Sequence, residues 1–167
     1  MPLGEFFKAL FGAYSYGKRI PQQLMYLPSD LIISLLRGLF QADGYISGEQ
    51  LGMLLANRSL TMQVHQLLLR LGYVFSIKEN THKNGRLPAY RLSAFASECA
   101  PLFEAFFDTP APVSGKSQYK VYVEVAGQRW LRIDQIHIQA YSGIVMDMEV
   151  AEDHSFVSAG VVVSNCY

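Results

Sequence analysis

Leu36-Arg37-Gly38-Leu39-Phe40-Gln41-Ala42-Asp43-Gly44 ends the clearest helical pattern in this 167-residue chain. Apolar residues recur at helical spacing from Leu31 to Phe40, and Asp30 suits the positively polarised first turn of a helix. Ser29 is the expected N-cap, and the Asp-Gly pair is expected to stop the helix after about three turns. The elements predicted for the chain up to about residue 108 follow this helix in sequence.

Short strands and further helices are expected to follow in a regular order. A second helix is predicted because Val64, Leu67, Leu68 and Leu71 have helical spacing and Gly72 follows them. Cys99 belongs to a similar apolar stripe in a last helix, where it is expected to lie in the core. The expected strands are 45–50 and 53–56, separated by Gly52, and then 73–78 and 88–92 on either side of a turn-rich segment. The predicted order is helix, two strands, helix, two strands, helix.

The second part of the chain has a different pattern, after a segment at 109–115 that contains two prolines and a glycine and is typical of a linker. Apolar and polar residues alternate over 119–125 and 144–150, which is the period of strands with one face in a core. Another strand is expected over 129–139. The segments 156–157 and 161–163 flank a hairpin-like connection, and the Val161–Val163 run is expected to be a core strand.

Composition narrows the function classes. The chain has 14 basic and 14 acidic residues and is half hydrophobic, so it is expected to fold and lacks the strong net positive charge of a dedicated nucleic-acid binder. Its two cysteines provide neither a disulfide framework nor paired zinc ligands. No apolar run is long enough for a membrane span and the first 20 residues lack the layout of a signal peptide, so a cytoplasmic protein without membrane contact is expected.

The last residues carry an intrinsic reactivity. Asn165 directly precedes Cys166 and follows a predicted strand. An asparagine side-chain amide can attack its own main-chain carbonyl, form a succinimide and expel the next residue as a free amine, and a fold that holds this geometry accelerates the reaction. Cys166 is a strong nucleophile once its thiolate is stabilised. His154 and Asp147 are the nearby titratable groups.

Two family resemblances cover nearly all of the chain. The segments 145–150, 153–157 and 160–163, with the terminal Asn165-Cys166, resemble the C-terminal splicing motifs of an intein. Lys18-Arg19-Ile20-Pro21 and residues 36–44 are similar to the second half of the LAGLIDADG homing-endonuclease domain found in many inteins. The resemblances imply an α+β chain in which a LAGLIDADG-type half domain (αββαββα) precedes the β-rich C-terminal part of a Hedgehog/intein (HINT) fold. The expected parts are a helical segment at 1–17, the half domain at 18–109, a linker at 110–118, the splicing segment at 119–165 and the start of the downstream extein at 166–167.

The intein resemblance also implies roles in autocatalytic, single-turnover splicing without a cofactor. Cys166 would begin the host protein fused after Asn165 and would attack the activated upstream junction, with Asp147 steering its thiol. Asn165 would then cyclise and release the downstream extein, with His154 moving a proton. Most inteins have His before this Asn, whereas this chain has Ser164, which would hold a water or leave the proton transfer to His154.

Upstream splicing motifs are missing from the sequence, because residue 1 is Met and no Thr-x-x-His motif is present. The resemblance therefore implies the C-terminal half of a split intein that splices in trans with a complementary N-terminal half. A piece cut from a contiguous intein would have the same sequence.

The endonuclease resemblance implies a second kind of activity. It makes Asp43 a candidate Mg²⁺ ligand, although Gln41 stands where the family usually has its earlier Asp. One such motif supplies one set of ligands, so cleavage would need a second motif from a partner. Arg58, Lys78 and Arg91 are candidate DNA contacts. Gly38 costs about 1 kcal/mol in a helix interior, which would be explained by close packing of two such helices.

The sequence leaves two functions open. The first is a self-splicing element, and the second is a LAGLIDADG homing-endonuclease or DNA-binding fragment with a β-rich appendage. The first predicts that Asn165→Ala stops release of a protein fused after Cys166, and the second predicts a metal-dependent activity on DNA that Asp43→Asn abolishes.

Overall fold

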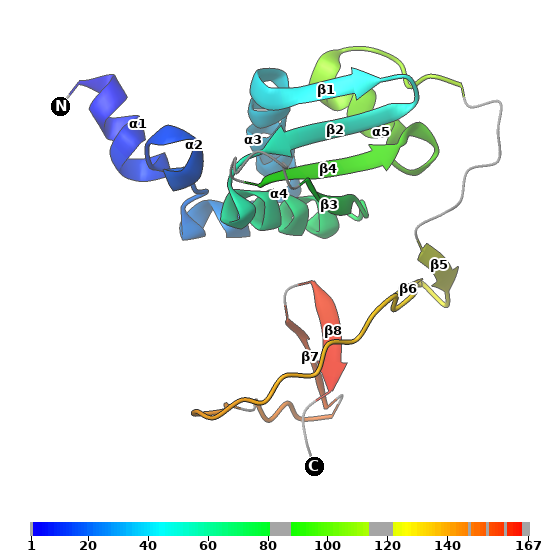
Figure 1. Cartoon of the computed structure of the whole chain (residues 1–167). Helices are drawn as coiled ribbons and strands as arrows, with labels where there is room; N and C mark the ends of the chain where they lie inside the picture. The colour runs from blue at the N-terminus through cyan, green and yellow to red at the C-terminus, as the bar shows by residue number, and fades with distance from the viewer. Residues whose placement is uncertain are drawn as a thin grey trace. The chain divides into compact units, whose positions relative to one another are not determined.

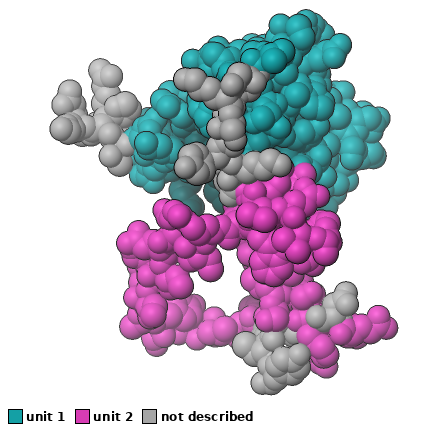
Figure 2. Space-filling model, turned by 90° about the vertical axis from the view of Figure 1, so that its right-hand side faces the viewer, with its two compact units in different colours: residues 1–120 teal, residues 121–167 magenta. Residues whose placement is uncertain are grey.

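A computed structural model describes residues 2–80, 88–113, 122–146, 148–152, 154–158 and 160–164. The chain divides into two units, residues 1–120 and residues 121–167, which Figure 2 shows in different colours. No helix among the described residues is both long enough and apolar enough to cross a membrane.

The first unit contains all the helices of the described chain and a four-stranded sheet (Figure 1). Its elements are α1 (Leu3–Phe11), α2 (Tyr14–Gly17), a 3-10 helix (Gln22–Tyr26), α3 (Ser29–Asp43), β1 (Gly44–Ser47), β2 (Gln50–Leu55), α4 (Arg58–Arg70), β3 (Ser76–Asn80), β4 (Ala89–Phe95) and α5 (Ala96–Phe107). From α3 to α5 the order is αββαββα, which confirms the prediction for this part of the chain.

The sheet is antiparallel, with the strand order β1-β2-β4-β3, and α3, α4 and α5 pack against one of its faces (Figure 1). Leu51, Met53 and Leu55 point from β2 into the core beneath these helices. The rings of Phe40 on α3 and Phe106 on α5 stack there with their centroids 4.7 Å apart. On β4, Leu92 and Ala94 are buried on the same side, and residues that alternate with the buried ones lie on the opposite face of the sheet.

Two local predictions about this unit are wrong. Pro28, not Ser29, occupies the N-cap of α3, and no side chain caps that helix. The turn between β1 and β2 lies at residues 48–49, so Gly52 is in the middle of β2. Gly52 can occupy a strand because the ring of Tyr45, its register partner on β1, lies over its Cα and fills the space of a side chain.

Side chains of α4 hold the segment that precedes α3. Asn57 accepts a hydrogen bond from the Leu60 amide as the N-cap of α4, and its Nδ2 donates to the carbonyls of Tyr16 and Lys18 at 2.7 Å. Gln63 bonds both the amide and the carbonyl of Ile20, and Arg70 donates to the carbonyls of Met25 and Leu27. Residues 16–27 therefore form a strap along α4, fixed by three side chains about two helical turns apart.

The second unit consists of two separate hairpins, one of β5 (Tyr122–Val125) and β6 (Gln128–Leu131) and one of β7 (Ser155–Ser158) and β8 (Val161–Ser164). None of its described residues is buried. The Val161–Val163 run is a strand, as predicted, but Val161 and Val162 are 63% and 68% exposed, so the expectation that it lies in a core is wrong.

The predicted strands at 129–139 and 144–150 also differ from the structure. The first ends at Leu131, and none of the described residues of the second is in a strand. Alternating residues favour an extended chain, but a strand also needs a neighbour for its backbone hydrogen bonds. Among the described residues of this unit, no such neighbour is present beyond the two hairpins.

Candidate nucleic-acid interface

The face of the sheet turned away from the helices is a surface built from the side chains of all four strands. We call it the open face. Register and burial place on it the residues that alternate with the buried ones: Tyr45, Ser47, Gln50, Gly52, Leu54, Ser76, Lys78, Asn80, Ala89, Arg91, Ser93 and Phe95. Most of these side chains are polar, and the charged ones are basic.

Lys78 and Arg91 lie directly opposite each other on β3 and β4, and both are exposed. Like charges in such a cross-strand pair destabilise a sheet. Among the described residues neither side chain forms an ion pair. The pair is therefore a local concentration of positive charge that an anionic ligand would relieve.

The structure thus brings together two of the three candidate DNA contacts. Arg58, the third, is the first residue of α4, and α4 packs against the opposite face of the sheet. Sequence reasoning missed Gln50 and Leu54 as members of the open face because it placed the β1–β2 turn at Gly52. The period-2 pattern of Leu51, Met53 and Leu55 was the signal that would have found them.

Asp43, the candidate metal ligand, is exposed at the last position of α3. Gly44 follows because a Cβ there would lie 2.4 Å from the carbonyl oxygen of Phe40, so only glycine lets the chain pass directly from the helix into β1. No group of three or more His, Cys, Asp or Glu among the described residues is arranged to hold a metal ion. One carboxylate alone does not make a Mg²⁺ site.

One side of α3 carries apolar and small residues that face solvent in this unit. Leu31 is 47% exposed, and Gly38 and Ala42 are exposed further along the same helix. A Cβ at Gly38 would meet no atom within 4 Å. The glycine is therefore not required by packing within the described chain, and it leaves room for a close neighbour.

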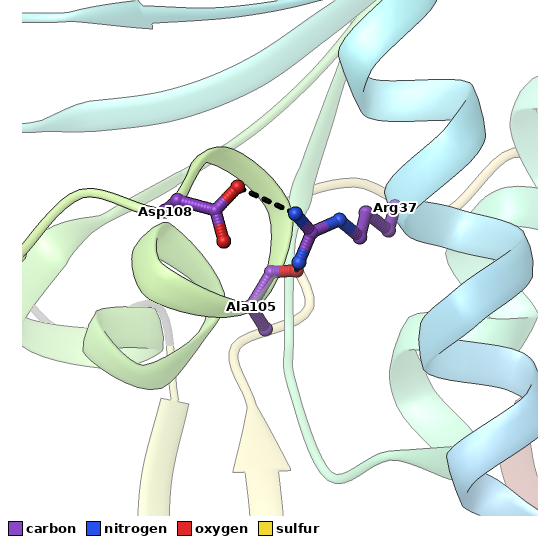
Figure 3. A network of polar contacts seen from close by, with 3 residues as sticks. All are labelled: Arg37, Ala105 and Asp108. Carbon is purple, nitrogen blue, oxygen red and sulfur yellow. Dashed lines mark hydrogen bonds and ion pairs between the residues drawn. The ribbon is translucent and has the colours of Figure 1, made fainter.

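Arg37 in the same motif ties α3 to the end of α5 (Figure 3). Its guanidinium donates to the carbonyl of Ala105 at 3.2 Å and forms an ion pair with Asp108 at 2.5 Å. Asp108 has a left-handed conformation, with φ of 51°, and its amide bonds to the carbonyl of Glu104 as the C-cap of α5. This contact is structural, because it satisfies the end of a helix.

The residues predicted for splicing are only partly described. Asp147, Asn165 and Cys166 lie outside the described residues. His154 is exposed and has a φ of 49°, and it directly precedes β7. Ser164 is the last residue of β8 and pairs with Ser155, the first residue of β7.

The fold and the open face define a class of α+β domain with one helix-covered and one exposed, basic sheet face. Residues 30–108 match the family model of the LAGLIDADG-like domain, so this part of the chain is LAGLIDADG-like. The family was thus correctly predicted for this part from residues 36–44.

Several known proteins are similar in sequence to this chain, some over nearly its whole length and others over less than half of it. The ATP-dependent DNA helicase Hel308 of Thermococcus kodakarensis is 28% identical over 173 residues, which cover 96% of this chain. Glutamine--fructose-6-phosphate aminotransferase of Methanocaldococcus jannaschii is 35% identical over 77 residues, or 40% of the chain. The chain spans only 15% and 7% of these two relatives. Among solved structures, variants of the homing endonuclease I-DmoI are 19% identical with a TM-score of 0.44, and the match covers 55% of this chain and 49% of that chain.

Proposed function

We propose that residues 18–109 are one half of an intein-borne LAGLIDADG homing endonuclease and bind duplex DNA through the open face. The observation that carries this proposal is the exposed Lys78–Arg91 pair, which lies on a mostly polar face and has no ion-pair partner among the described residues. Basic side chains fix a protein on the phosphate backbone, and polar strand residues reach base edges in the major groove.

Cleavage would need a second half. The exposed side of α3, with Gly38 open, is where an equivalent helix would pack, since a glycine permits close approach of two helices. In that assembly Asp43 would be one Mg²⁺ ligand, and the second half would supply the other acidic ligands. A bound Mg²⁺ would stabilise charge on the phosphate oxygens during strand cleavage.

DNA binding is tested by fluorescence anisotropy with duplex DNA over a series of salt concentrations. Lys78→Gln and Arg91→Gln should each weaken binding and reduce the slope of log K against log salt by about 1 for each lost phosphate contact. Arg58→Gln is the matched control, because it removes the same charge from a position outside the open face, and it should leave the slope unchanged. Equal effects of all three substitutions would contradict the proposal.

A second function, protein splicing, is favoured by the second unit. Its described residues bury no side chain, and large apolar groups such as Ile138 (93% exposed) and Met146 (89% exposed) face solvent. Such a surface is far more apolar than that of a stable isolated unit. We propose that a complementary N-terminal intein half covers it and completes a HINT fold.

We assign the splicing chemistry to the end of the β7–β8 hairpin, because His154 directly precedes Ser155, and Ser155 pairs with Ser164, the last described residue. The side-chain amide nitrogen of Asn165 would attack its own carbonyl carbon, a succinimide would form, and the bond to the Cys166 nitrogen would break. His154 would then give a proton to the departing amine, and Asp147 would act earlier on the Cys166 thiol.

The relatives support an inserted element. Similar segments make up a minor part of a helicase and of an aminotransferase, two enzymes whose names share no chemistry. A stretch that occurs within proteins of unrelated activity is expected to have a function of its own, such as excision. The proposal covers both arrangements, in which the two intein halves are separate chains or parts of one polypeptide.

Splicing is tested with a reporter fused after Cys166 and a complementary N-terminal half, supplied either as a separate chain or in one polypeptide. Asn165→Ala should abolish reporter release, and mass spectrometry of the wild-type product should find the C-terminal succinimide. Ser164→His should accelerate release if the residue before the asparagine limits proton transfer. A wild-type complex that leaves the Asn165–Cys166 bond intact would exclude this function without affecting the DNA-binding proposal.

A further inference from the structure

Among the apolar residues of the open face, Leu54 is exposed, whereas Ala89 and Phe95 are half-buried. Leu54 lies on β2, a central strand of the sheet, and is 48% exposed, whereas Leu51, Met53 and Leu55 on the same strand are buried. A single exposed leucine is ordinary on a protein surface, and what distinguishes Leu54 is the set of side chains beside it.

The neighbours of Leu54 are the two basic residues. Leu54 pairs with Arg91 on β4, and Arg91 pairs with Lys78 on β3, so the three side chains form one row across the sheet. In the adjacent row the Tyr45 ring occupies the place of a side chain at Gly52. Leu54 is consequently an exposed apolar side chain in the same row as a cationic pair.

A DNA duplex offers two kinds of contact to such a row. Phosphates attract the lysine and the arginine, and such phosphate contacts carry no sequence information. An apolar side chain at the base edges has a single apolar partner in the major groove, the C5 methyl group of thymine. A leucine gains by burying that methyl group and gains nothing from the polar edges of other bases.

We propose that Leu54 reads a pyrimidine C5 methyl group in the major groove and so contributes to the sequence specificity of the open face. This inference rests on the proposed DNA binding and adds to it a specific group on the ligand. The methyl group can belong to thymine or to 5-methylcytosine.

The experiment begins with selection of a preferred duplex from a random library by the full chain. Each thymine of that duplex is then replaced by deoxyuridine, which removes only the methyl group. At one position the replacement should weaken binding about fourfold, the ratio expected for taking one methyl-sized group out of water. Leu54→Ala should abolish this difference and bind the thymine and uracil duplexes equally.

Ile46→Ala is the matched control. Ile46 is 39% exposed on β1 but belongs to the helix-covered side of the sheet, so this variant should keep the thymine-to-uracil ratio even if it is less stable. Circular dichroism of all variants verifies that the fold is retained. At the responsive pair, duplexes with cytosine and with 5-methylcytosine show whether the methyl group is recognised on either pyrimidine or on thymine only.

The outcomes distinguish the role of Leu54 from DNA binding by the open face. Failure of the wild-type chain to bind any duplex would overturn both proposals. DNA binding without any thymine-to-uracil effect, a selected site without thymine, or an effect that persists in Leu54→Ala would overturn the role of Leu54 and leave DNA binding in place.

Discussion

His65 shows how one buried atom makes stability depend on pH. Its Nε2 lies 3.1 Å from the carbonyl oxygen of Phe75, which makes Nε2 the donor, and its Nδ1 is buried without a hydrogen-bond partner in the described part of the chain. Burial lowers the pKa of His65 below its usual value, and the bond to Phe75 opposes this shift in part. The folded state therefore favours the neutral imidazole.

Because the folded pKa is lower than the unfolded one, the stability contributed by neutral His65 is complete above about pH 6.5 and is lost as the pH falls below that value. We expect the free energy of unfolding to decrease from pH 7 to pH 5. His65→Gln keeps an amide donor for Phe75 but does not titrate, so it should flatten this dependence. Urea unfolding at several pH values measures the free energy of unfolding of the wild-type chain and of the variant. The same pH dependence in both would contradict the attribution to His65.

At the scale of elements, the strap along α4 depends on Asn57, which is 8% exposed. Asn57→Ala removes the helix cap and leaves the carbonyls of Tyr16 and Lys18 without their donor. We expect a loss of about 2–3 kcal/mol in the free energy of unfolding. Asn57→Ser keeps a cap acceptor but lacks the amide donor, so this variant should be about 1 kcal/mol more stable than Asn57→Ala. Chemical denaturation measures the free energy of unfolding of both variants. No difference between the two variants would mean that the cap contributes nothing.

The strand β2 contains a second sensitive position. A Cβ at Gly52 would lie 2.6 Å from the hydroxyl of Tyr45 and 2.9 Å from the backbone carbonyl oxygen of Leu92. Tyr45 can move, but the carbonyl belongs to the sheet. Gly52→Ala should therefore cost about 1–3 kcal/mol, and Tyr45→Ala in the same chain should not restore the stability. A double-mutant cycle by thermal unfolding measures this coupling.

The elements also show how far sequence reasoning reaches. Helical periodicity predicted α3, α4 and α5 and the burial of Cys99. It failed at Ser29 and at the β1–β2 turn, since caps and turns depend on single backbone conformations that several residues can adopt. In the second unit, alternation indicated which side of a strand is apolar but gave no information on whether anything covers it. The period-2 pattern of Leu51, Met53 and Leu55 shows which residues of β2 lie on the open face, but which residues of the other strands lie beside them follows only from the register.

At the scale of the whole molecule, the two units differ in what stabilises them. The first has a continuous apolar core, and the described residues of the second have none. Limited proteolysis should therefore cleave at low protease concentration within residues 122–164 and leave a resistant fragment that retains residues 16–108. Mass spectrometry identifies the fragments. Addition of a complementary N-terminal half should protect the second unit, whereas cleavage within α3 or β2 first would contradict this order.

The contact of Arg37 with the end of α5 has a mechanical consequence. A tensile load applied beyond Asp108 would reach the guanidinium before it could unwind the last turn of α5, because Arg37 holds both Ala105 and Asp108. The end of α5 is thereby fastened to α3, so fraying of this helix end under load requires the Arg37 contacts to break first.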